Sequence, residues 1–249
     1  MSNEKNRHSF TGSMGFVLAA AGSAVGLGNI WRFPYLAARD GGGLFLVIYI
    51  ILALTFGFTL LTTEVAIGRK TKQSPLTAYS KVKKGWGFLG VIASLVPVII
   101  MPYYCVIGGW VVKYFIAFLT GEGTAAAEDG YFGGFITGHV QPIALMVIFL
   151  FIVAFIVFLG VEKGIESSSK IIMPILILLV IAISIFAITI RYTDAEGVTR
   201  TGLEGLKIYV IPNLEGLTVK RFFSVLLDAM GQLFFSLSVA MGIMIAYGS

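Results

Sequence analysis

Charged side chains are scarce in this chain, and so are the residues that build disulfides and metal sites. Asp, Glu, Lys and Arg make up 12% of the 249 residues, about half the share found in soluble domains. The single cysteine, Cys105, excludes an internal disulfide framework, and it argues against a metal site built on cysteine. The two histidines, His8 and His139, lie too far apart in the sequence to indicate a metal-binding pair.

Hydrophobic residues are abundant instead. They make up 57% of the chain, and the mean hydropathy is +0.91, which indicates an integral membrane protein in contact with a lipid bilayer. Runs of about 20 apolar residues are long enough to span a membrane. We count six such runs, at about 10–38, 44–67, 88–119, 142–159, 165–190 and 219–249.

Lys and Arg predict the orientation of the spans. The net charge is +5, but its 18 basic residues are scattered among apolar runs, so the positive-inside rule explains them better than a nucleic-acid partner does. The loop from Arg69 to Trp86 holds six basic residues and no acidic one. The loop from Gly121 to Gln141 holds three acidic residues and no Lys or Arg. We therefore expect a cytoplasmic N-terminus.

Two of the six spans are interrupted. The first contains Gly22, Gly26 and Gly28 within seven residues, and each glycine costs a helix about 1 kcal/mol relative to alanine. The sixth carries polar residues in its apolar stretch, namely Gln232, Ser236 and Ser238. The serines alone fit equally well with side chains that bond to their own helix. Broken helices at membrane depth, however, are tolerated where they line a cavity, and pairs of them are typical of transporters built from inverted repeats.

Other polar residues in the spans leave alternatives open. Glu64 either reaches the inner membrane interface or accepts hydrogen bonds from N–H groups freed where a neighbouring helix unwinds. Arg32 is either a solvated interface residue or one arm of an outer gate. Tyr103 and Tyr104 follow Pro102 in the third span, and buried tyrosines most often bond only to a neighbouring helix.

The interrupted first span also carries a recognisable motif. GSAVGLGNIWRFP at residues 22–34, GGG at 41–43 and EVAIGR at 64–69 strongly resemble the neurotransmitter:sodium symporters, in particular the bacterial amino-acid members with the leucine-transporter fold, over essentially the whole chain. The resemblance implies an all-α, polytopic membrane protein with about six transmembrane helices, the first and sixth discontinuous. It also implies the bacterial inner membrane and sodium-coupled symport by alternating access.

The resemblance carries over ion and substrate ligands residue by residue. It implies one or two Na⁺ ions. The first would be bound by Ala24, Asn29 and Ser236, and the second by carbonyls of Gly22 and Val25. The substrate would be an amino acid, because Gly26 replaces the acidic residue of members that carry monoamines. Its carboxylate would meet the N–H groups of the Leu27–Gly28 turn and the hydroxyl of Tyr104. The rest of the substrate would contact the residues Ala24, Tyr103, Phe235, Ser236, Ser238 and Met241.

Further roles follow from the same resemblance. Arg7 matches the inner-gate arginine, Arg32 an outer-gate residue, and Phe235 the aromatic lid. The family's chloride-site positions are Tyr49, Gln232 and Ser236, so chloride is a second candidate ion. Met241 stands where the leucine-selective relative has a bulky aromatic residue, so we expect a larger hydrophobic or aromatic substrate side chain, although Met241 equally fits ordinary core filling. Gly164 and Pro174 match an element proposed to unwind near the inner sodium, but a proline in the first helical turns is tolerated in any case.

The length departs from the family, whose members have about twice as many spans. We therefore expect a truncated inverted-repeat fold: a first repeat at 1–190, an external loop at 191–218 and the first helix of a second repeat at 219–249. The remaining half of the transporter would be a necessary partner, and the chain alone would not transport. A channel and a non-transporting scaffold or binding module remain alternatives. An enzyme is not indicated, since no paired carboxylates, histidine pair or nucleophile motif is found in the spans.

Overall fold

The computed structural model describes residues 12–26, 28–193 and 197–249. Within them, four helices are long and apolar enough to cross a membrane: 43–71, 87–119, 141–158 and 161–189. A fifth span results if the bent pair Ser13–Ala24 and Gly28–Arg39, whose axes differ by 55°, counts as one. The predicted interruption of the first span is thus confirmed.

The described residues fold mostly into helices, and three of the helical segments among them are short π-helical turns (η). In chain order the elements are α1 Ser13–Ala24, η1 Gly28–Arg32, α2 Phe33–Arg39, α3 Gly43–Leu52, η2 Ala53–Gly57, α4 Phe58–Thr71, α5 Pro75–Val82, α6 Gly87–Leu119, α7 Gly123–Ala126, α8 Tyr131–Ile136, α9 Gln141–Phe158, η3 Val161–Glu166, α10 Ser167–Thr189, β1 Arg191–Thr193, β2 Thr199–Thr201, α11 Gly202–Val210, α12 Val219–Leu237 and α13 Ile243–Gly248.

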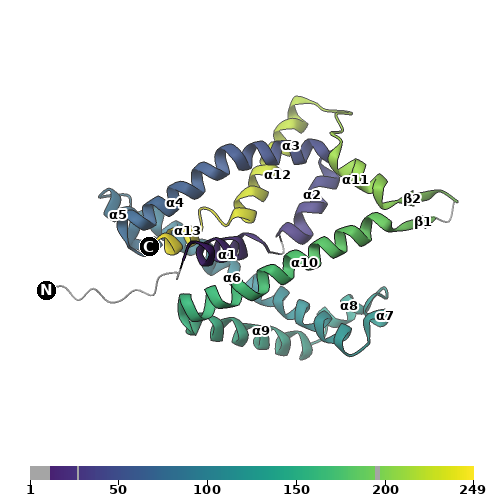
Figure 1. Ribbon diagram of the computed structural model, residues 1–249, viewed down its shortest axis with the longest axis horizontal. Coiled ribbons are helices and arrows are strands. Elements are labelled where there is room, and N and C mark those ends of the chain that lie inside the picture. Colours follow the sequence, from purple (N-terminus) through teal and green to yellow (C-terminus); the bar gives the residue numbers. More distant parts are fainter. Residues whose placement is uncertain (1–11, 27, 194–196) are drawn as a thin grey trace.

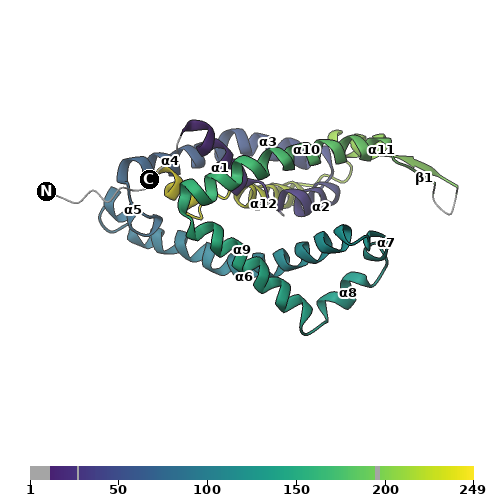
Figure 2. The ribbon, with the colours of Figure 1, turned by 60° about the horizontal axis from the view of Figure 1, so that its bottom comes forward.

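The helices form two groups. Figure 1 shows α12 lying between α2 and the continuous rod of α3 and α4. Figure 2 shows α6 to α9 on one side and the remaining long helices on the other. The two groups meet through α5 and α6, and also through α9, η3 and α10. Because α12 packs on η1, α2 and α3, the two interrupted spans lie side by side.

The sixth span is interrupted as predicted. Its first part, α12, begins at the N-cap Thr218, whose hydroxyl accepts a hydrogen bond from the Arg221 N–H at 3.2 Å. It ends at Leu237 because Ser238 adopts a left-handed conformation with φ 51°. The chain resumes helical structure only in α13. Lys220, Arg221 and Asp228 make α12 more polar than the four apolar helices.

A compact apolar core joins α2, α3 and α12. Its buried members are Leu36, Ala37, Leu44, Phe45, Ile48, Val225 and Ala229, with Phe33 and Tyr49 packed against them. The Phe33 ring meets the rings of Phe45 and Tyr49 edge-on, at centroid distances of 5.3 and 4.8 Å. This core fixes α2, the second half of the broken first span, against α12.

The segment after α10, residues 191–218, contains more secondary structure than the sequence predicts. The sequence predicts an external loop at 191–218, and the structure contains the short helix α11 within it. Its N-terminus carries a reciprocal capping box between Thr201 and Glu204, with hydrogen bonds of 2.8 and 3.3 Å. The antiparallel pair β1 and β2 was not predicted, since Arg191, Tyr192 and Thr193 give too short a pattern to indicate a strand.

Two long spans contain π-helical turns that the sequence does not announce. η2 joins α3 to α4, and η3 precedes α10. Gly160, with φ 84°, lies between the end of α9 and the first residue of η3. Pro174 lies inside α10 rather than in its first turn. The Gly164–Pro174 element thus begins in a π turn, which is a common site of local rearrangement in helices.

The α6–α9 contact predicts a stability effect. A Cβ added to Gly109 on α6 would lie 2.7 Å from the N atom and 2.9 Å from the Cα atom of Met146 on α9, so the helices must separate. We expect Gly109→Ala to lower the free energy of unfolding by about 1–3 kcal/mol, seen as a lower Tm in detergent. Gly133→Ala on α8, where nothing lies within 4 Å, is the control. Equal Tm values for the two variants would contradict this packing argument.

Candidate functional site

A small cavity lies where the first span is broken. Its volume is about 100 Å³. The lining residues come mostly from the break itself, with two aromatic side chains added: Gly22, Ser23, Ala24, Val25, Gly26, Gly28, Asn29, Tyr104 and Phe235. Because α1 ends at Ala24 and η1 begins at Gly28, the backbone leaves helical geometry at Val25 and Gly26, so N–H and C=O groups at the break need partners outside a regular helix, from side chains or from a ligand.

Hydrogen bonds bring three predicted sodium ligands together. The Asn29 side chain donates from Nδ2 to the Ala24 carbonyl at 2.7 Å. The Ser236 hydroxyl donates to Asn29 Oδ1 at 2.5 Å. A carbonyl, an amide side chain and a hydroxyl are thus linked by consecutive hydrogen bonds, and oxygen ligands of these kinds suit a hard cation. The donor set fits Na⁺.

Gln232 locks this cluster to the first span. The residue is fully buried, and its Nε2 group donates to the Gly28 carbonyl at 2.9 Å and to the Ser236 hydroxyl oxygen at 3.0 Å. Both amide hydrogens are therefore used. Gln232 Oε1 is buried and has no hydrogen-bond partner among the described residues.

The break in the sixth span is held from two sides. Ser238 Oγ donates to the Ser23 carbonyl at 2.6 Å, which joins the two breaks directly. Ala240, also left-handed with φ 63°, donates its N–H to Glu64 Oε1 at 2.6 Å. A left-handed conformation is costly for residues other than glycine, so these side chains stabilise a backbone that would not persist alone.

The structure decides between the two alternatives that the sequence leaves open for the environment of Glu64. It lies on α4, and only 5% of its surface is exposed. Its hydrogen bond from the Ala240 N–H confirms the second alternative, that the carboxylate accepts from a group freed by a neighbouring unwound helix. The other oxygen, Oε2, has no hydrogen-bond partner among the described residues.

Two larger cavities flank the small one. An apolar cavity of about 270 Å³ is lined by Ser23, Pro97, Ile100, Met101, Tyr104, Phe235, Ser238, Met241 and Ile243. A second cavity of about 410 Å³ is lined by Gly28, Trp31, Arg32, Tyr35, Tyr103 and Phe235. The Phe235 ring borders all three cavities, and its centroid lies 6.0 Å from that of Tyr104. Phe235 is thus shared by the small cavity and by the cavity that Arg32 and Tyr103 line.

The predicted site residues fall into three sets in the structure. Most of them line one of the cavities or belong to the hydrogen-bonded cluster: Gly22, Ala24, Val25, Gly28, Asn29, Arg32, Tyr103, Tyr104, Gln232, Phe235, Ser236, Ser238 and Met241. Tyr49 makes its ring contacts in the α2–α3 core. Leu27 and Arg7 lie outside the described residues.

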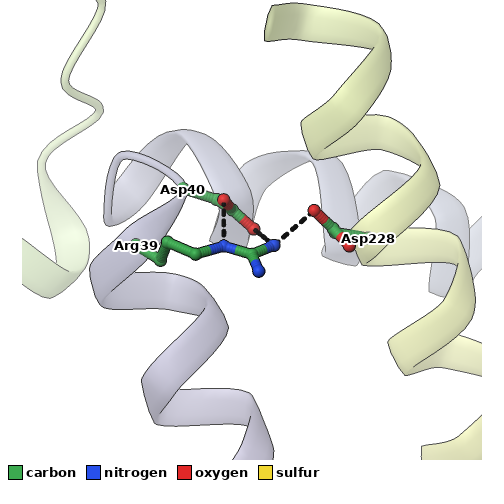
Figure 3. A network of polar contacts seen from close by, with 3 residues as sticks. All are labelled: Arg39, Asp40 and Asp228. Atoms are coloured by element: carbon green, nitrogen blue, oxygen red, sulfur yellow. Dashed lines mark hydrogen bonds and ion pairs between the residues drawn. The ribbon is translucent and has the colours of Figure 1, made fainter.

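Sequence reasoning missed an ion-pair network near the end of α2. Arg39 contacts both Asp40, its neighbour in the chain, and Asp228 of α12 (Figure 3). The available signal was Asp228 itself, a charged residue four positions before Gln232 in the sixth span. Its partner on α2, however, is 189 positions away in the sequence, and no local pattern identifies it.

Comparison with protein families and curated proteins gives consistent matches. The family model described as the sodium:neurotransmitter symporter family matches residues 7–126 and 136–249. The sodium-dependent transporter YhdH of Bacillus subtilis is 33% identical over 252 residues, which cover 99% of this chain and 53% of that protein. A sodium-dependent transporter of Methanocaldococcus jannaschii is 36% identical, with 98% and 49% covered. The rat sodium- and chloride-dependent GABA transporter 2 is 27% identical, with 98% and 45% covered.

A solved structure matches the fold. The crystal structure of MhsT in complex with L-phenylalanine superposes with a TM-score of 0.83 at 34% sequence identity, covering 97% of this chain and 53% of that one. The chain therefore spans about half the length of the relatives it matches. These relatives are named as transporters and not as enzymes.

The hydrogen bond between the two breaks predicts a measurable cost when it is lost. Ser238→Ala removes the donor to the Ser23 carbonyl, so we expect the free energy of unfolding to fall by about 1 kcal/mol, read as a lower Tm in detergent. Ser184→Ala is the matched control, because the Ser184 hydroxyl bonds only within its own helix, to the Val180 carbonyl at 2.7 Å. A Ser238→Ala variant as stable as the control would show that the two breaks do not support one another.

Proposed function

The chain belongs to the sodium:neurotransmitter symporter family, and on that premise we propose that it forms the ion- and substrate-binding half of a sodium-coupled amino-acid symporter. The observation that carries the proposal is the pairing of two interrupted helices beside a small cavity at the break of the first span, through the Ser238–Ser23, Ser236–Asn29 and Gln232–Gly28 hydrogen bonds. Interrupted helices of this kind hold ions and small polar substrates in secondary transporters.

Sodium is the coupling ion in this proposal. One ion takes the Ala24 carbonyl, Asn29 Oδ1 and the Ser236 hydroxyl, which the structure already gathers. A second ion takes the carbonyls of Gly22 and Val25, which line the same cavity. The family's chloride-type positions, Tyr49, Gln232 and Ser236, are a further candidate. Chloride there requires Gln232 to exchange one of the two hydrogen bonds that Nε2 makes.

The substrate is an amino acid with a hydrophobic or aromatic side chain. Its carboxylate meets the N–H groups at Leu27–Gly28 and the Tyr104 hydroxyl, where the start of a helix favours negative charge. The ammonium group faces the carbonyls of Ala24, Phe235 and Ser236 and the hydroxyl oxygen of Ser238. MhsT, the structural neighbour, is described in complex with L-phenylalanine.

Cavity volume supports the choice of side chain. The apolar cavity beside Tyr104 and Phe235 measures about 270 Å³ and ends at Met241. A flexible, unbranched methionine adapts to large side chains. This cavity therefore suits the aromatic or branched part of the substrate, while the small cavity suits its charged end.

Transport follows alternating access in a multi-pass membrane protein. We place the N-terminus and the basic loop 69–86 in the cytoplasm, by the positive-inside rule, and the protein in the bacterial inner membrane. Arg7 serves as the inner gate and Arg32 as the outer gate. Phe235 serves as the lid between the two larger cavities. The relatives are about twice as long as this chain, so a second half of the transporter completes the ion sites and the gates.

Substitution at Gly26 tests the choice of substrate. A Cβ at this position lies in ordinary contact with the Tyr104 hydroxyl, at 4.0 Å, so Gly26→Ala should still bind phenylalanine. Gly26→Asp places a carboxylate beside that of the substrate, and we expect about a hundredfold or greater loss of affinity from like-charge repulsion. Phenylethylamine, which lacks the carboxylate, should bind this variant better than wild type. Unchanged phenylalanine binding to Gly26→Asp would exclude the proposed pose.

Uptake into proteoliposomes tests the coupling. We expect no sodium-driven accumulation of radiolabelled phenylalanine by the 249 residues alone. Accumulation that follows the sodium gradient is expected when the chain is expressed with the rest of its reading frame, taken from the DNA downstream of the Ser249 codon. Accumulation by the chain alone would remove the need for a second half. Uptake that ignores sodium would contradict coupling, and ion flux without accumulation would favour a channel.

A further inference from the structure

Three polar residues at intervals of four run along one face of α12. They are Asp228, Gln232 and Ser236, and residues four apart lie one above the other on a helix. Each bonds to the first span: Ser236 to Asn29, Gln232 to Gly28 and Asp228 to Arg39. The two inner contacts belong to the proposed sodium site, whereas the outer contact lies outside it.

The outer contact is a three-membered ionic network. Arg39 Nε donates to Asp40 Oδ1 at 2.9 Å and Nη2 to Asp40 Oδ2 at 3.0 Å, and Nη2 also contacts Asp228 Oδ2. Figure 3 shows the guanidinium lying between the two carboxylates, with Asp228 projecting from α12. Two-pronged pairs of this kind fix orientation as well as adding energy.

Asp40 holds the guanidinium in place. Its side chain is only 10% exposed, and both of its oxygens accept hydrogen bonds from Arg39. Its N–H donates to the Leu36 carbonyl at 2.9 Å, which anchors the residue at the end of α2. The Arg39 guanidinium also lies 5.8 Å from the centre of the Tyr35 ring. Arg39 is thereby aimed at Asp228 instead of turning freely into solvent.

The segment Gly28–Arg39 contacts α12 at both of its ends. Its ends are eleven positions apart in the sequence, or roughly 16 Å at the rise per residue of an α-helix. Gln232 and Ser236 attach its inner end, at Gly28 and Asn29, and the Arg39 network attaches its outer end. The apolar core of α2, α3 and α12 already packs this segment on α12, and the Arg39 network adds a directional contact at its outer end.

We propose that Arg39, through Asp228, is a positioning residue for the sodium site: it holds the outer end of the Gly28–Arg39 segment on α12 and so keeps Asn29 aligned with Ser236. The inference rests on the proposed function for its sodium readout and on the structure alone for its second readout. Exposed ion pairs are commonly worth little, and the Arg39 and Asp228 side chains are 44% and 30% exposed. The test therefore compares Arg39 with an ordinary surface arginine.

Sodium affinity is the first readout, measured as the half-saturating sodium concentration for phenylalanine uptake by the full-length transporter. We expect Arg39→Gln and Asp228→Asn each to raise it about three- to tenfold. The double variant should be no worse than either single one. The charge swap Arg39→Asp with Asp228→Arg should restore it to within about twofold. Arg191→Gln, on exposed β1, is the control and should change nothing.

Amide hydrogen exchange is the second readout, and it uses the 249-residue chain in detergent. We expect faster exchange over Gly28–Arg39 in Arg39→Gln and Asp228→Asn, unchanged exchange in α6, and wild-type exchange in the charge swap and in Arg191→Gln. If Arg39→Gln does not fold, Asp228→Asn and Arg39→Lys provide the same comparison.

The outcomes separate the two hypotheses. A wild-type protein without sodium dependence would overturn the proposed function. The hydrogen-exchange experiment would still test whether the Arg39 network holds the outer end of the segment on α12. If hydrogen exchange over Gly28–Arg39 is the same in Arg39→Gln and Arg191→Gln, the proposed positioning role of Arg39 is wrong. A lower maximal rate with unchanged half-saturating sodium would also overturn it, because the network would then serve a step other than alignment of the ion site.

Discussion

Two interrupted helices satisfy one another in this fold, and the rest of the architecture depends on that exchange. Backbone groups in an apolar surrounding cost several kcal/mol each when left without partners. Here the Ser23 carbonyl receives the Ser238 hydroxyl, and the Gly28 carbonyl receives the Gln232 amide. Each break is therefore tolerable only because the other is present. The polar cavity between them is a consequence of the same pairing.

Local chemistry made the breaks and the spans predictable. The spans follow from apolar runs, and the first break follows from the glycines clustered at 22–28. Both are local patterns, so both can be read directly from the sequence. The role of Glu64 was a choice between two alternatives, because its partner is 176 positions away at Ala240. Only the folded chain brings that N–H to the carboxylate. The family resemblance supplied the residues of the site, and the hydrogen bonds among Ala24, Asn29 and Ser236 supply their geometry.

Features that depend on long-range packing could not be predicted from the sequence. The π turns η2 and η3 have no composition that distinguishes them from ordinary helix, and the β1–β2 pair is only three residues long on each side. The Arg39 network joins positions 189 apart. Charge in a span was the only available signal for it, because a charged residue such as Asp228 within a membrane-spanning helix needs a partner.

The four-residue spacing along α12 makes its fit to the first span discrete. A slip of one residue turns the helix by about 100°, so Asp228, Gln232 and Ser236 would leave their partners together. Partial misalignment therefore has no favourable intermediate. The three contacts together therefore fix the rotation of α12 about its own axis as well as its place beside the first span.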